Sequence, residues 1–325
     1  MNDYKDKKKL GLGRSLMRNQ KWADPKKPRC LVTGHKGYIG SRLYQYLKTN
    51  GYDTIGIDIK DGHDINVDLN GGETGDAFHP FYFNFKPEII FHLACRPRVG
   101  YSVKHPVETT KNNVLATTNV LNFANKVGAR RVIFSSSSSV VGEGSGPISP
   151  YALQKLYSEM ECKLYTQLYG VDTVSLRYFN VYSEDQPHDG AYTTFVANWM
   201  HHIRSNQTPF LNGDGSIRRD MVHVNDVISA NLFFANYDKP LMGEQYDVGT
   251  GCNISMKETI ELVRKHFPQL EYETRPPRDG DVSSTKANPS KAKKLGWSPS
   301  VSIEEGLTKC FQNLQKQMEK NNEII

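Results

Sequence analysis

The feature that most constrains the fold is an alternation of short apolar runs with helical stretches along the first half of the chain. Each run is rich in Val, Ile, Leu or Phe and is bounded by turn residues. Strands of a parallel sheet have such continuous apolar sequences, because the helices that connect them bury both faces of the sheet. We predict strands at 30–33, 54–58, 89–93, 131–135 and 173–177, and helices at 38–49, 113–127 and 151–169. The sequence therefore predicts an α/β fold built on a doubly wound parallel sheet.

The texture of the sequence changes past about residue 180, where Pro, Gly and Asn become frequent and the order of elements is less regular. Residues 221–250 again read as a helix followed by a strand, so we expect the chain to return to the sheet there. We therefore predict a Rossmann-type nucleotide-binding domain at 29–180, with a return segment at 221–250. A smaller C-terminal α/β substrate-binding region is expected at 181–220 and 251–317, where residues 289–317 include an amphipathic helix.

Residues 1–28 form a basic tail that carries much of the net charge of +6. Such a cluster is typical of a nucleic-acid or membrane contact, or of a solvated tail. We favour the solvated tail, because aromatic side chains hardly interleave with the charges. No apolar run approaches the ~20 residues of a membrane span, and no signal peptide is recognisable. We expect no nucleic-acid partner, no membrane partner and a cytoplasmic location.

The segment Thr-Gly-His-Lys-Gly-Tyr-Ile-Gly, residues 33–40, follows the first expected strand and opens the first expected helix. Gly34 permits a tight turn, Gly37 lets the backbone approach a pyrophosphate, and Gly40 lets the helix pack close to the strand. The helix N-terminus then offers N–H groups and a partial positive charge to the phosphates. Three glycines in this strand–turn–helix context predict a dinucleotide site.

Asp58 ends the second expected strand, where an acidic residue accepts hydrogen bonds from the adenosine ribose of a dinucleotide. A carboxylate at this point also repels a 2′-phosphate, which favours NAD over NADP. Lys36 in the glycine turn is a basic side chain that could instead assist a 2′-phosphate. We predict NAD on the strength of Asp58.

Tyr151 and Lys155 are four residues apart, so they share one face of the expected helix. A free tyrosine has a pKa near ~10 and is a poor base at neutral pH. A neighbouring ammonium and a positive nicotinamide ring stabilise the phenolate, which can take a proton from a substrate hydroxyl as hydride leaves the same carbon. The serine run at 135–139 leaves an apolar strand at its carboxyl end, where parallel sheets place their sites. That placement favours a catalytic pair over an exposed Tyr and Lys on a surface helix.

With these motifs the chain resembles the extended short-chain dehydrogenases/reductases, and among them the NAD-dependent sugar-nucleotide epimerases and dehydratases. The resemblance extends from about residue 29 to residue 307. The matching segments are 33–40, 58, 68–69, 92–94, 112–114, 135–142, 151–155, 177–180, 213–215, 219–226 and 278–281.

The resemblance implies which residues contact the cofactor. Asp68 and Leu69 correspond to a pair beside the adenine. Leu93 and Ala94 correspond to a backbone wall along the cofactor, and Tyr178 to a position against the nicotinamide. The full implied set is Gly34, Gly37, Tyr38, Ile39, Gly40, Asp58, Asp68, Leu69, Leu93, Ala94, Asn113, Tyr151, Lys155 and Tyr178.

The resemblance also implies the catalytic and substrate residues. The catalytic set is Ser137, Tyr151 and Lys155, and Ser139 is a second hydroxyl nearby. Residues that hold the diphosphate of a nucleotide-diphosphate sugar correspond to Asn180, Arg219 and Arg278. The planar guanidinium group suits this task, because it donates two parallel hydrogen bonds to phosphate oxygens.

The residues after Ser137 bear on the reaction. Dehydratases of this family carry an acidic residue directly after the catalytic hydroxyl, whereas Ser138 and Ser139 stand there in this chain. Tyr, Lys, Ser and NAD alone suit epimerisation at C4 through a transient 4-keto sugar. A 4-ketoreductase would use the same residues and is the main alternative, with a dehydratase less favoured. A non-catalytic NAD-binding scaffold is the alternative of another class, and the complete catalytic set counts against it.

Two departures from the family pattern concern the substrate. The segment 142–151 is shorter than in many relatives, and Val141 stands where many have tyrosine. Thr285 corresponds to a position where a bulky residue restricts the size of the sugar. Its small side chain predicts that an N-acetylhexosamine is tolerated.

The resemblance further implies a homodimer, in which helices corresponding to 113–127 and 151–169 pack against those of a second subunit. Tyr157, Leu164 and Leu168 could supply an apolar face, unless they only cover the sheet. The five cysteines are scattered and never spaced as CxxC, and His201 and His202 lack the helical i,i+4 spacing of a metal pair. We therefore expect neither a disulfide framework nor a metal site.

Overall fold

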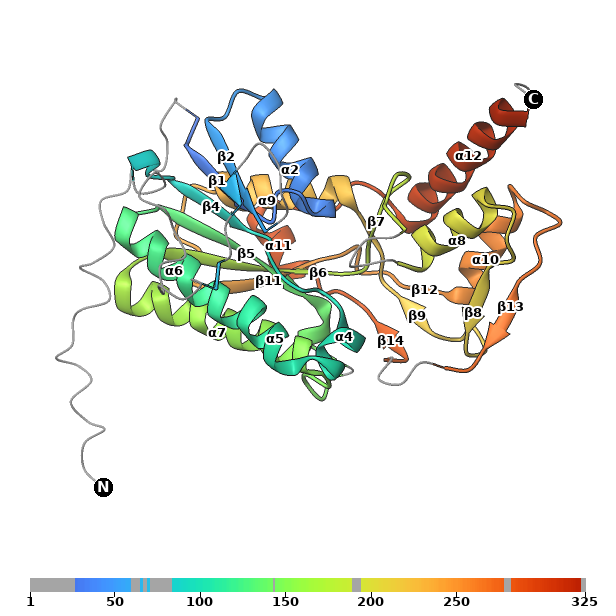
Figure 1. Ribbon diagram of the computed structural model, residues 1–325, viewed down its shortest axis with the longest axis horizontal. Coiled ribbons are helices and arrows are strands. Elements are labelled where there is room, and N and C mark those ends of the chain that lie inside the picture. The colour runs from blue at the N-terminus through green and yellow to red at the C-terminus, as the bar shows by residue number, and fades with distance from the viewer. Residues whose placement is uncertain are drawn as a thin grey trace.

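The computed structural model of the chain describes residues 27–59, 65–66, 69–70, 84–142, 144–188, 194–277 and 282–322 (Figure 1). Most of the basic tail, residues 1–26, lies outside the described residues, and so do two predicted site residues, Asp68 and Arg278.

A parallel sheet of seven strands, in the order β11-β6-β5-β4-β1-β2-β3, forms the centre of the molecule. Its strands are β1 (Cys30–Thr33), β2 (Thr54–Asp58), β3 (Ile65–Asn66), β4 (Ile89–His92), β5 (Arg131–Ser137), β6 (Asp172–Tyr178) and β11 (Glu244–Val248). The predicted doubly wound sheet is confirmed, with the first two strands at their predicted bounds. β5 and β6 run further than predicted, because their polar ends stay paired: Ser137 lies opposite Tyr178.

Helices cover both faces of this sheet, as Figure 1 shows. The helices α2 (Tyr38–Thr49) and α9 (Val224–Asn236) bury Leu43, Leu47 and Phe234 in one core. The helices α6 (Ala116–Val127) and α7 (Pro150–Tyr169) bury Val120 and Cys162 in a second core on the other face. Burial on both faces explains why the strands read as continuous apolar runs.

The helix expected at 113–127 is longer and less regular than predicted. Helical structure begins at α5 (Pro106–Thr110) and passes through a π-helical turn, η2 (Lys111–Leu115), into α6. The short helix α4 (Val99–Lys104) precedes them. A π turn carries one extra residue per turn, and such turns are frequent at functional sites.

The smaller region has its own core, which Trp199, Ile260 and Phe311 share. Its helices are α8 (Phe195–Arg204), α10 (Met256–Arg264) and α12 (Ile303–Asn322), while α11 (Ser290–Leu295) packs on the first core. Three short sheets join β7 (Val181–Tyr182) to β10 (Val222–His223), β8 (Phe210–Asn212) to β13 (Glu273–Arg275), and β9 (Arg218–Arg219) to β12 (Ile254–Ser255) and β14 (Ser284–Thr285).

Between β6 and β11 the chain leaves the large sheet and comes back to it as α9 and β11. The predicted domain boundaries remain a prediction. No helix along the described residues is long and apolar enough to cross a membrane.

Candidate active site

The glycine turn leaves no room for side chains at its core. Gly34 has a φ of +71°, and a Cβ atom there would lie 2.8 Å from the backbone nitrogen of Ala94. A Cβ atom on Gly40 would overlap the carbonyl oxygen of Gly34. In the described part of the chain no side chain caps α2 at Gly37, so its first N–H groups face the turn. This cradle fits the pyrophosphate of a dinucleotide.

Asp58 lies beside this turn at the end of β2. Its Oδ2 accepts a 2.9 Å hydrogen bond from the backbone N–H of Lys36, so the turn and the predicted ribose carboxylate are held together. Asp68 lies outside the described residues. Its neighbour Leu69 is buried, and the Leu69 carbonyl accepts a 2.7 Å hydrogen bond from the Asn119 side chain. The predicted cofactor contacts of these residues remain predictions.

The predicted wall along the cofactor is held by a hydroxyl that the sequence did not single out. Thr33 Oγ1 accepts hydrogen bonds from the backbone N–H groups of Leu93 and Ala94, both at 3.1 Å. Two amide donors fill the acceptor sites of this hydroxyl, so its own hydrogen is directed to His92 Nδ1 at 2.8 Å. Thr33 therefore fixes the path of the chain as it leaves β4.

His92 continues this hydrogen-bond chain beneath the site. Its Nε2 lies 3.0 Å from Thr117 Oγ1, and accepting at Nδ1 makes Nε2 the protonated nitrogen. Burial, with the nearby Lys155 charge, lowers the pKa of His92 from 6.5 to about 3, so the ring is neutral. The sequence clue was a lone polar residue inside an apolar strand, but nothing in the pattern named its partners.

Tyr151 and Lys155 come together on the first turns of α7, as predicted from their spacing. Ser149 caps this helix by accepting a 3.2 Å hydrogen bond from the Ala152 N–H. Lys155 Nζ lies 5.9 Å from the centre of the Tyr151 ring and donates a 2.6 Å hydrogen bond to the carbonyl of Ser135. Both side chains are buried at the carboxyl end of the sheet.

The serines that end β5 have different partners. Ser135 Oγ lies 3.1 Å from the hydroxyl of Tyr178, and Ser136 Oγ donates to the buried Glu159 carboxylate at 2.6 Å. Ser137 Oγ accepts from the backbone N–H and the hydroxyl of Ser139, at 3.2 and 3.0 Å. This leaves the hydrogen of the Ser137 hydroxyl available to donate to a substrate oxygen. Within the run 135–139, Ser137, Ser138 and Ser139 retain partial exposure.

Tyr178 is a second phenol near the site, and its surroundings distinguish it from Tyr151. Its hydroxyl accepts a 2.8 Å hydrogen bond from Asn231 Nδ2 and contacts Ser135. Burial raises the pKa of Tyr178 to about 12, which keeps this phenol protonated. Tyr178 is therefore suited to forming a wall rather than to taking a proton.

Tyr38 and Ile39 lie in the first turn of α2, and both touch the same core. Tyr38 donates a 2.7 Å hydrogen bond to Ser183 in the smaller region, and the Arg42 guanidinium lies 4.4 Å above its ring. Ile39 packs against the core shared by α2 and α9. The Tyr38 side chain thus connects the glycine turn to the segment after β7, while its predicted cofactor contact remains a prediction.

The predicted diphosphate residues lie around β9 and β14. Asn180 has a φ of +34°, and its Nδ2 donates to the carbonyl of Asp220 at 2.7 Å and to Thr285 Oγ1 at 3.2 Å. Arg219 and Thr285 are opposite each other in the parallel pair β9–β14. The structure therefore gathers Asn180, Arg219 and Thr285, whereas Arg278 lies outside the described residues.

Asp220, which the sequence reading left without a role, holds this group together. Its buried carboxylate accepts hydrogen bonds from the backbone N–H groups of Thr250, Gly251 and Ala287, at 2.9, 2.9 and 3.0 Å. Three loops meet at this one side chain. Its location next to Arg219 was visible in the sequence, but its partners are set by the tertiary fold.

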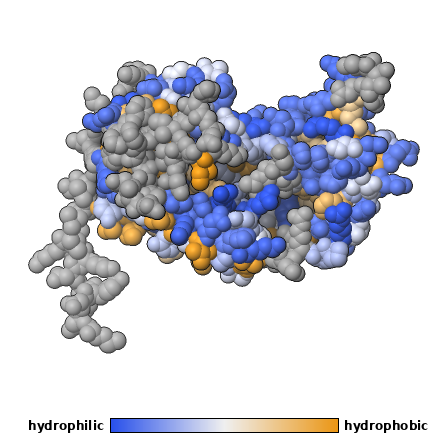
Figure 2. Space-filling view, in the orientation of Figure 1, coloured by the Kyte–Doolittle hydropathy of each residue, from blue (hydrophilic) through white to orange (hydrophobic). Residues whose placement is uncertain are grey.

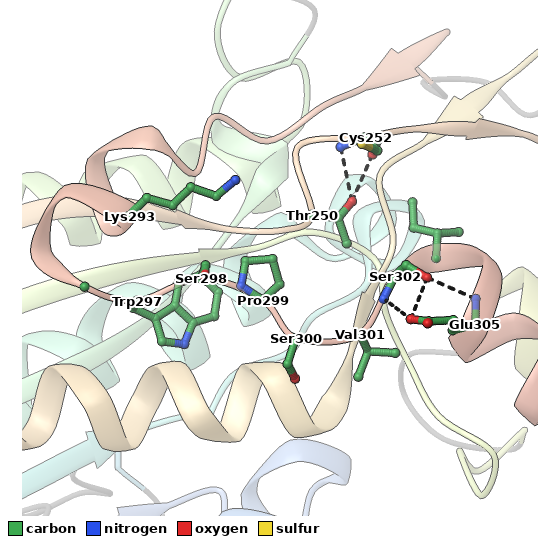
Figure 3. Close-up of a pocket in the computed structure, with 12 residues that line it drawn as sticks. Thr250, Cys252, Lys293, Trp297, Ser298, Pro299, Ser300, Val301, Ser302 and Glu305 are labelled. Carbon is green, nitrogen blue, oxygen red and sulfur yellow. Dashed lines mark hydrogen bonds between the residues drawn. The ribbon is translucent and has the colours of Figure 1, made fainter.

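A groove of about 640 Å³ lies elsewhere, between the turn after β11 and the start of α12 (Figure 3). Two serines that line it donate to carboxylates: Ser302 to Glu305 at 2.8 Å, and Ser300 to Asp226 at 2.7 Å. None of the predicted catalytic or cofactor residues that the structure describes lines it. The predicted catalytic residues lie at the carboxyl ends of the strands instead.

The fold and the site define a class: α/β proteins with a glycine turn that fits a dinucleotide and with Tyr, Lys and Ser side chains at the same carboxyl edge of the sheet. Residues 30–249 match the NAD-dependent epimerase/dehydratase family over more than half of the chain. The chain belongs to this family. Tyr151, Lys155 and Ser137 lie within the matched residues.

Known relatives are similar over nearly their whole length. A UDP-glucose 4-epimerase of Mycolicibacterium smegmatis is 34% identical over 87% of this chain and 97% of its own. The crystal structure of Thermotoga maritima UDP-glucose 4-epimerase with UDP-glucose has a TM-score of 0.80 at 30% identity, covering 89% of this chain and 99% of that one. A UDP-N-acetylglucosamine 4-epimerase of Methanobrevibacter ruminantium, solved with UDP-N-acetylmuramic acid, has a TM-score of 0.79 at 26% identity, covering 90% and 99%.

Proposed function

We propose that this protein interconverts the C4 epimers of a UDP-sugar with bound NAD. The observation that carries the proposal is that Tyr151, Lys155 and Ser137 lie at the carboxyl edge of the sheet, where the glycine turn also lies, with no acid after Ser137. The UDP-sugar 4-epimerases that the chain resembles support the choice of reaction and nucleotide.

The roles follow from the geometry. Tyr151 takes the proton of the sugar's 4-hydroxyl, and the Lys155 charge beside it favours the ionised phenol. Ser137 donates a hydrogen bond to the same oxygen, because its acceptor side is already occupied by Ser139. When bound, NAD supplies reversible hydride transfer at C4. The predicted dehydratase alternative lacks its acid, because Ser138 and Ser139 stand where that group would be.

The residues proposed to hold the substrate's diphosphate lie around β9 and β14. Asn180 and Arg219 are the described residues suited to it, and Arg278 completes the predicted set. With the diphosphate anchored, the 4-keto sugar ring can rotate and present its opposite face to the nicotinamide, which 4-epimerisation requires. The small Thr285 beside Asn180 supports room for an N-acetyl group in this part of the site.

The test is to incubate the purified protein with UDP-glucose, UDP-N-acetylglucosamine and UDP-glucuronate and to identify products by NMR. We expect C4 epimers without net formation or consumption of reduced cofactor, and with the acetylated sugar turned over. Stoichiometric formation of reduced cofactor from added NAD, together with a 4-keto sugar, would instead indicate a 4-ketoreductase running in the reverse direction. Binding of NAD without any turnover would indicate the scaffold.

We also propose a homodimer that packs through α7. Tyr157, Leu164 and Leu168 are 52%, 48% and 54% exposed in the protomer, so the alternative that they only cover the sheet is wrong. Leu153 and Met160 extend the row at 59% and 64%. Figure 2 shows apolar atoms along the lower edge of the molecule, where α5 and α7 lie in Figure 1. A row of this kind along a long helix is suited to burial against a second copy.

A further inference from the structure

A chain of buried hydrogen bonds connects the catalytic helix to the segment that leaves β4. Gln154, between Tyr151 and Lys155 on α7, donates from Nε2 to the hydroxyls of Thr109 and Thr110 at 3.0 and 3.1 Å. Its Oε1 accepts a 2.8 Å hydrogen bond from Asn113 Nδ2 in the π turn. The side chains of Gln154 and Asn113 are almost fully buried, at 5% and 3% exposure.

The hydroxyls of Thr109 and Thr110 determine which groups donate and which accept in this set of hydrogen bonds. Thr109 donates its hydroxyl hydrogen to a backbone carbonyl, His105 at 3.0 Å or Pro106 at 3.1 Å, and Thr110 donates to Pro106 at 2.8 Å. Each hydroxyl has one hydrogen, so both can only accept from Gln154. The NH₂ group of Gln154 must therefore face α5, and its oxygen must face Asn113.

The direction carries through Asn113 to the backbone of Arg96. With its Nδ2 shared between Gln154 and the Arg96 carbonyl, at 2.8 and 3.2 Å, Asn113 presents Oδ1 to the Arg96 N–H at 2.7 Å. Both amides are then fully satisfied, and only one orientation of each is compatible with the set. The Asn113 side-chain amide thus forms hydrogen bonds with both the backbone N–H and the backbone carbonyl of Arg96, in the segment after β4.

That segment connects the two halves of the reaction site. It begins at Ala94, which contacts the glycine turn at Gly34, and ends on Ser102, whose hydroxyl accepts a 3.0 Å hydrogen bond from the Tyr151 N–H. Arg96 lies between these ends. Its backbone thus lies on the stretch of chain that joins the predicted cofactor wall to the contact with Tyr151.

We propose that Gln154 is a positioning residue, which orients the Asn113 amide and so fixes the segment between the cofactor wall and Tyr151. The inference rests on the proposed epimerase function for its kinetic readout. Gln154 touches neither substrate nor cofactor in this role. It acts through Asn113 and Arg96.

The first test is Gln154→Met, which keeps the length of the side chain and removes both of its polar groups. We expect kcat for the UDP-sugar to fall by about tenfold to a hundredfold, because the reacting groups are displaced. We expect KM to change less than about twofold, because the diphosphate residues lie on other elements. A fluorescence titration should show weaker binding of reduced NAD by the protein freed of nucleotide.

The matched control is Thr166→Val on the same helix. Thr166 is also buried, and its hydroxyl bonds to the Val171 carbonyl just before β6 and to Thr173 in β6. This variant should lose stability while kcat, KM and nucleotide affinity stay at wild-type values. It separates a positioning effect from general loss of stability in α7.

A second variant covers the case in which Gln154→Met does not fold. The double change Thr109→Val and Thr110→Val leaves α7 intact and removes the acceptors that orient Gln154, so the same fall in kcat is expected. Wild-type kcat and nucleotide affinity in either folded variant would overturn the inference. An inactive wild type that still binds NAD would count against the epimerase proposal, and the nucleotide titration would then decide on Gln154 alone.

Discussion

At the scale of single residues, the roles proposed for Tyr151 and Ser137 predict effects of different size. Tyr151→Phe removes the proton acceptor, so kcat should fall by about a thousandfold, within the range of general acid–base catalysis. Ser137→Ala removes one donated hydrogen bond, and about tenfold to a hundredfold is expected. Steady-state kinetics on each variant checks this, with thermal unfolding as the control for folding. A Tyr151→Phe enzyme with more than a tenth of wild-type kcat would contradict the assigned role.

His92 should make the free energy of unfolding depend on pH in the acid range. Its pKa is depressed from 6.5 to about 3 in the folded protein, so below about pH 6.5 the unfolded chain binds a proton that the folded one excludes. The free energy of unfolding should therefore decrease as pH falls from about 6.5 towards 3, by up to about 1.4 kcal/mol per pH unit from this residue.

The measurement is urea unfolding of wild type and His92→Gln across this pH range. The amide can keep the contacts to Thr33 and Thr117 without titrating, so the variant should show a flatter acid limb. Parallel curves for the two proteins would show that His92 does not carry this dependence.

The sequence indicated the candidate reacting residues, but not the residues that hold them in place. Tyr151, Lys155 and the glycines follow from spacing, because helix periodicity and turn geometry are local. Thr33, Asp220 and Gln154 are polar residues whose partners lie on other elements, at Ala94, Ala287 and Asn113. No local pattern encodes such partners, since packing in three dimensions determines them.

At the scale of elements, the strands were predicted closely and the helix at 113–127 was not. Apolar runs with turn residues at both ends fix β1 and β2, because burial on two faces leaves few other structures for them. The π turn at Lys111–Leu115 has one residue more than a regular α-helical turn. Asn113, in this turn, bonds to the backbone of Arg96 in another segment. Periodicity alone cannot show that insertion.

The contact between α12 and β7 predicts how two substitutions change the free energy of unfolding. A Cβ atom on Gly306 would overlap the hydroxyl oxygen of Tyr182, and this oxygen is buried without a hydrogen-bond partner among the described residues. Gly306→Ala should lower the free energy of unfolding by about 1–3 kcal/mol through overpacking. Tyr182→Phe should leave it unchanged or raise it by up to about 1 kcal/mol, because an unsatisfied polar group is removed.

Chemical denaturation of the two single variants and the double variant checks this pair. The double variant should recover part of the loss seen in Gly306→Ala, since the atom that clashes is gone. Strict additivity of the two changes would show that the two residues do not contact each other in solution.

At the scale of the whole molecule, the exposed row on α7 predicts the oligomeric state. The wild-type protein should behave as a dimer in light scattering, and Leu164→Glu should shift it towards monomer by placing a charge in the apolar contact. Lys163→Glu, next to it on the same helix and also exposed, is a charge-change control that should remain dimeric. A monomeric wild type at micromolar concentration would rule out the proposed dimer.

The central claim is that a hydride leaves C4 of the sugar and returns to that carbon within one site. The direct measurement uses UDP-glucose carrying deuterium at C4, incubated with the protein and followed by NMR. We predict that the epimeric product retains the deuterium at C4 and that none appears in solvent or in added cofactor. Loss of the label from C4 as product forms would contradict the claim.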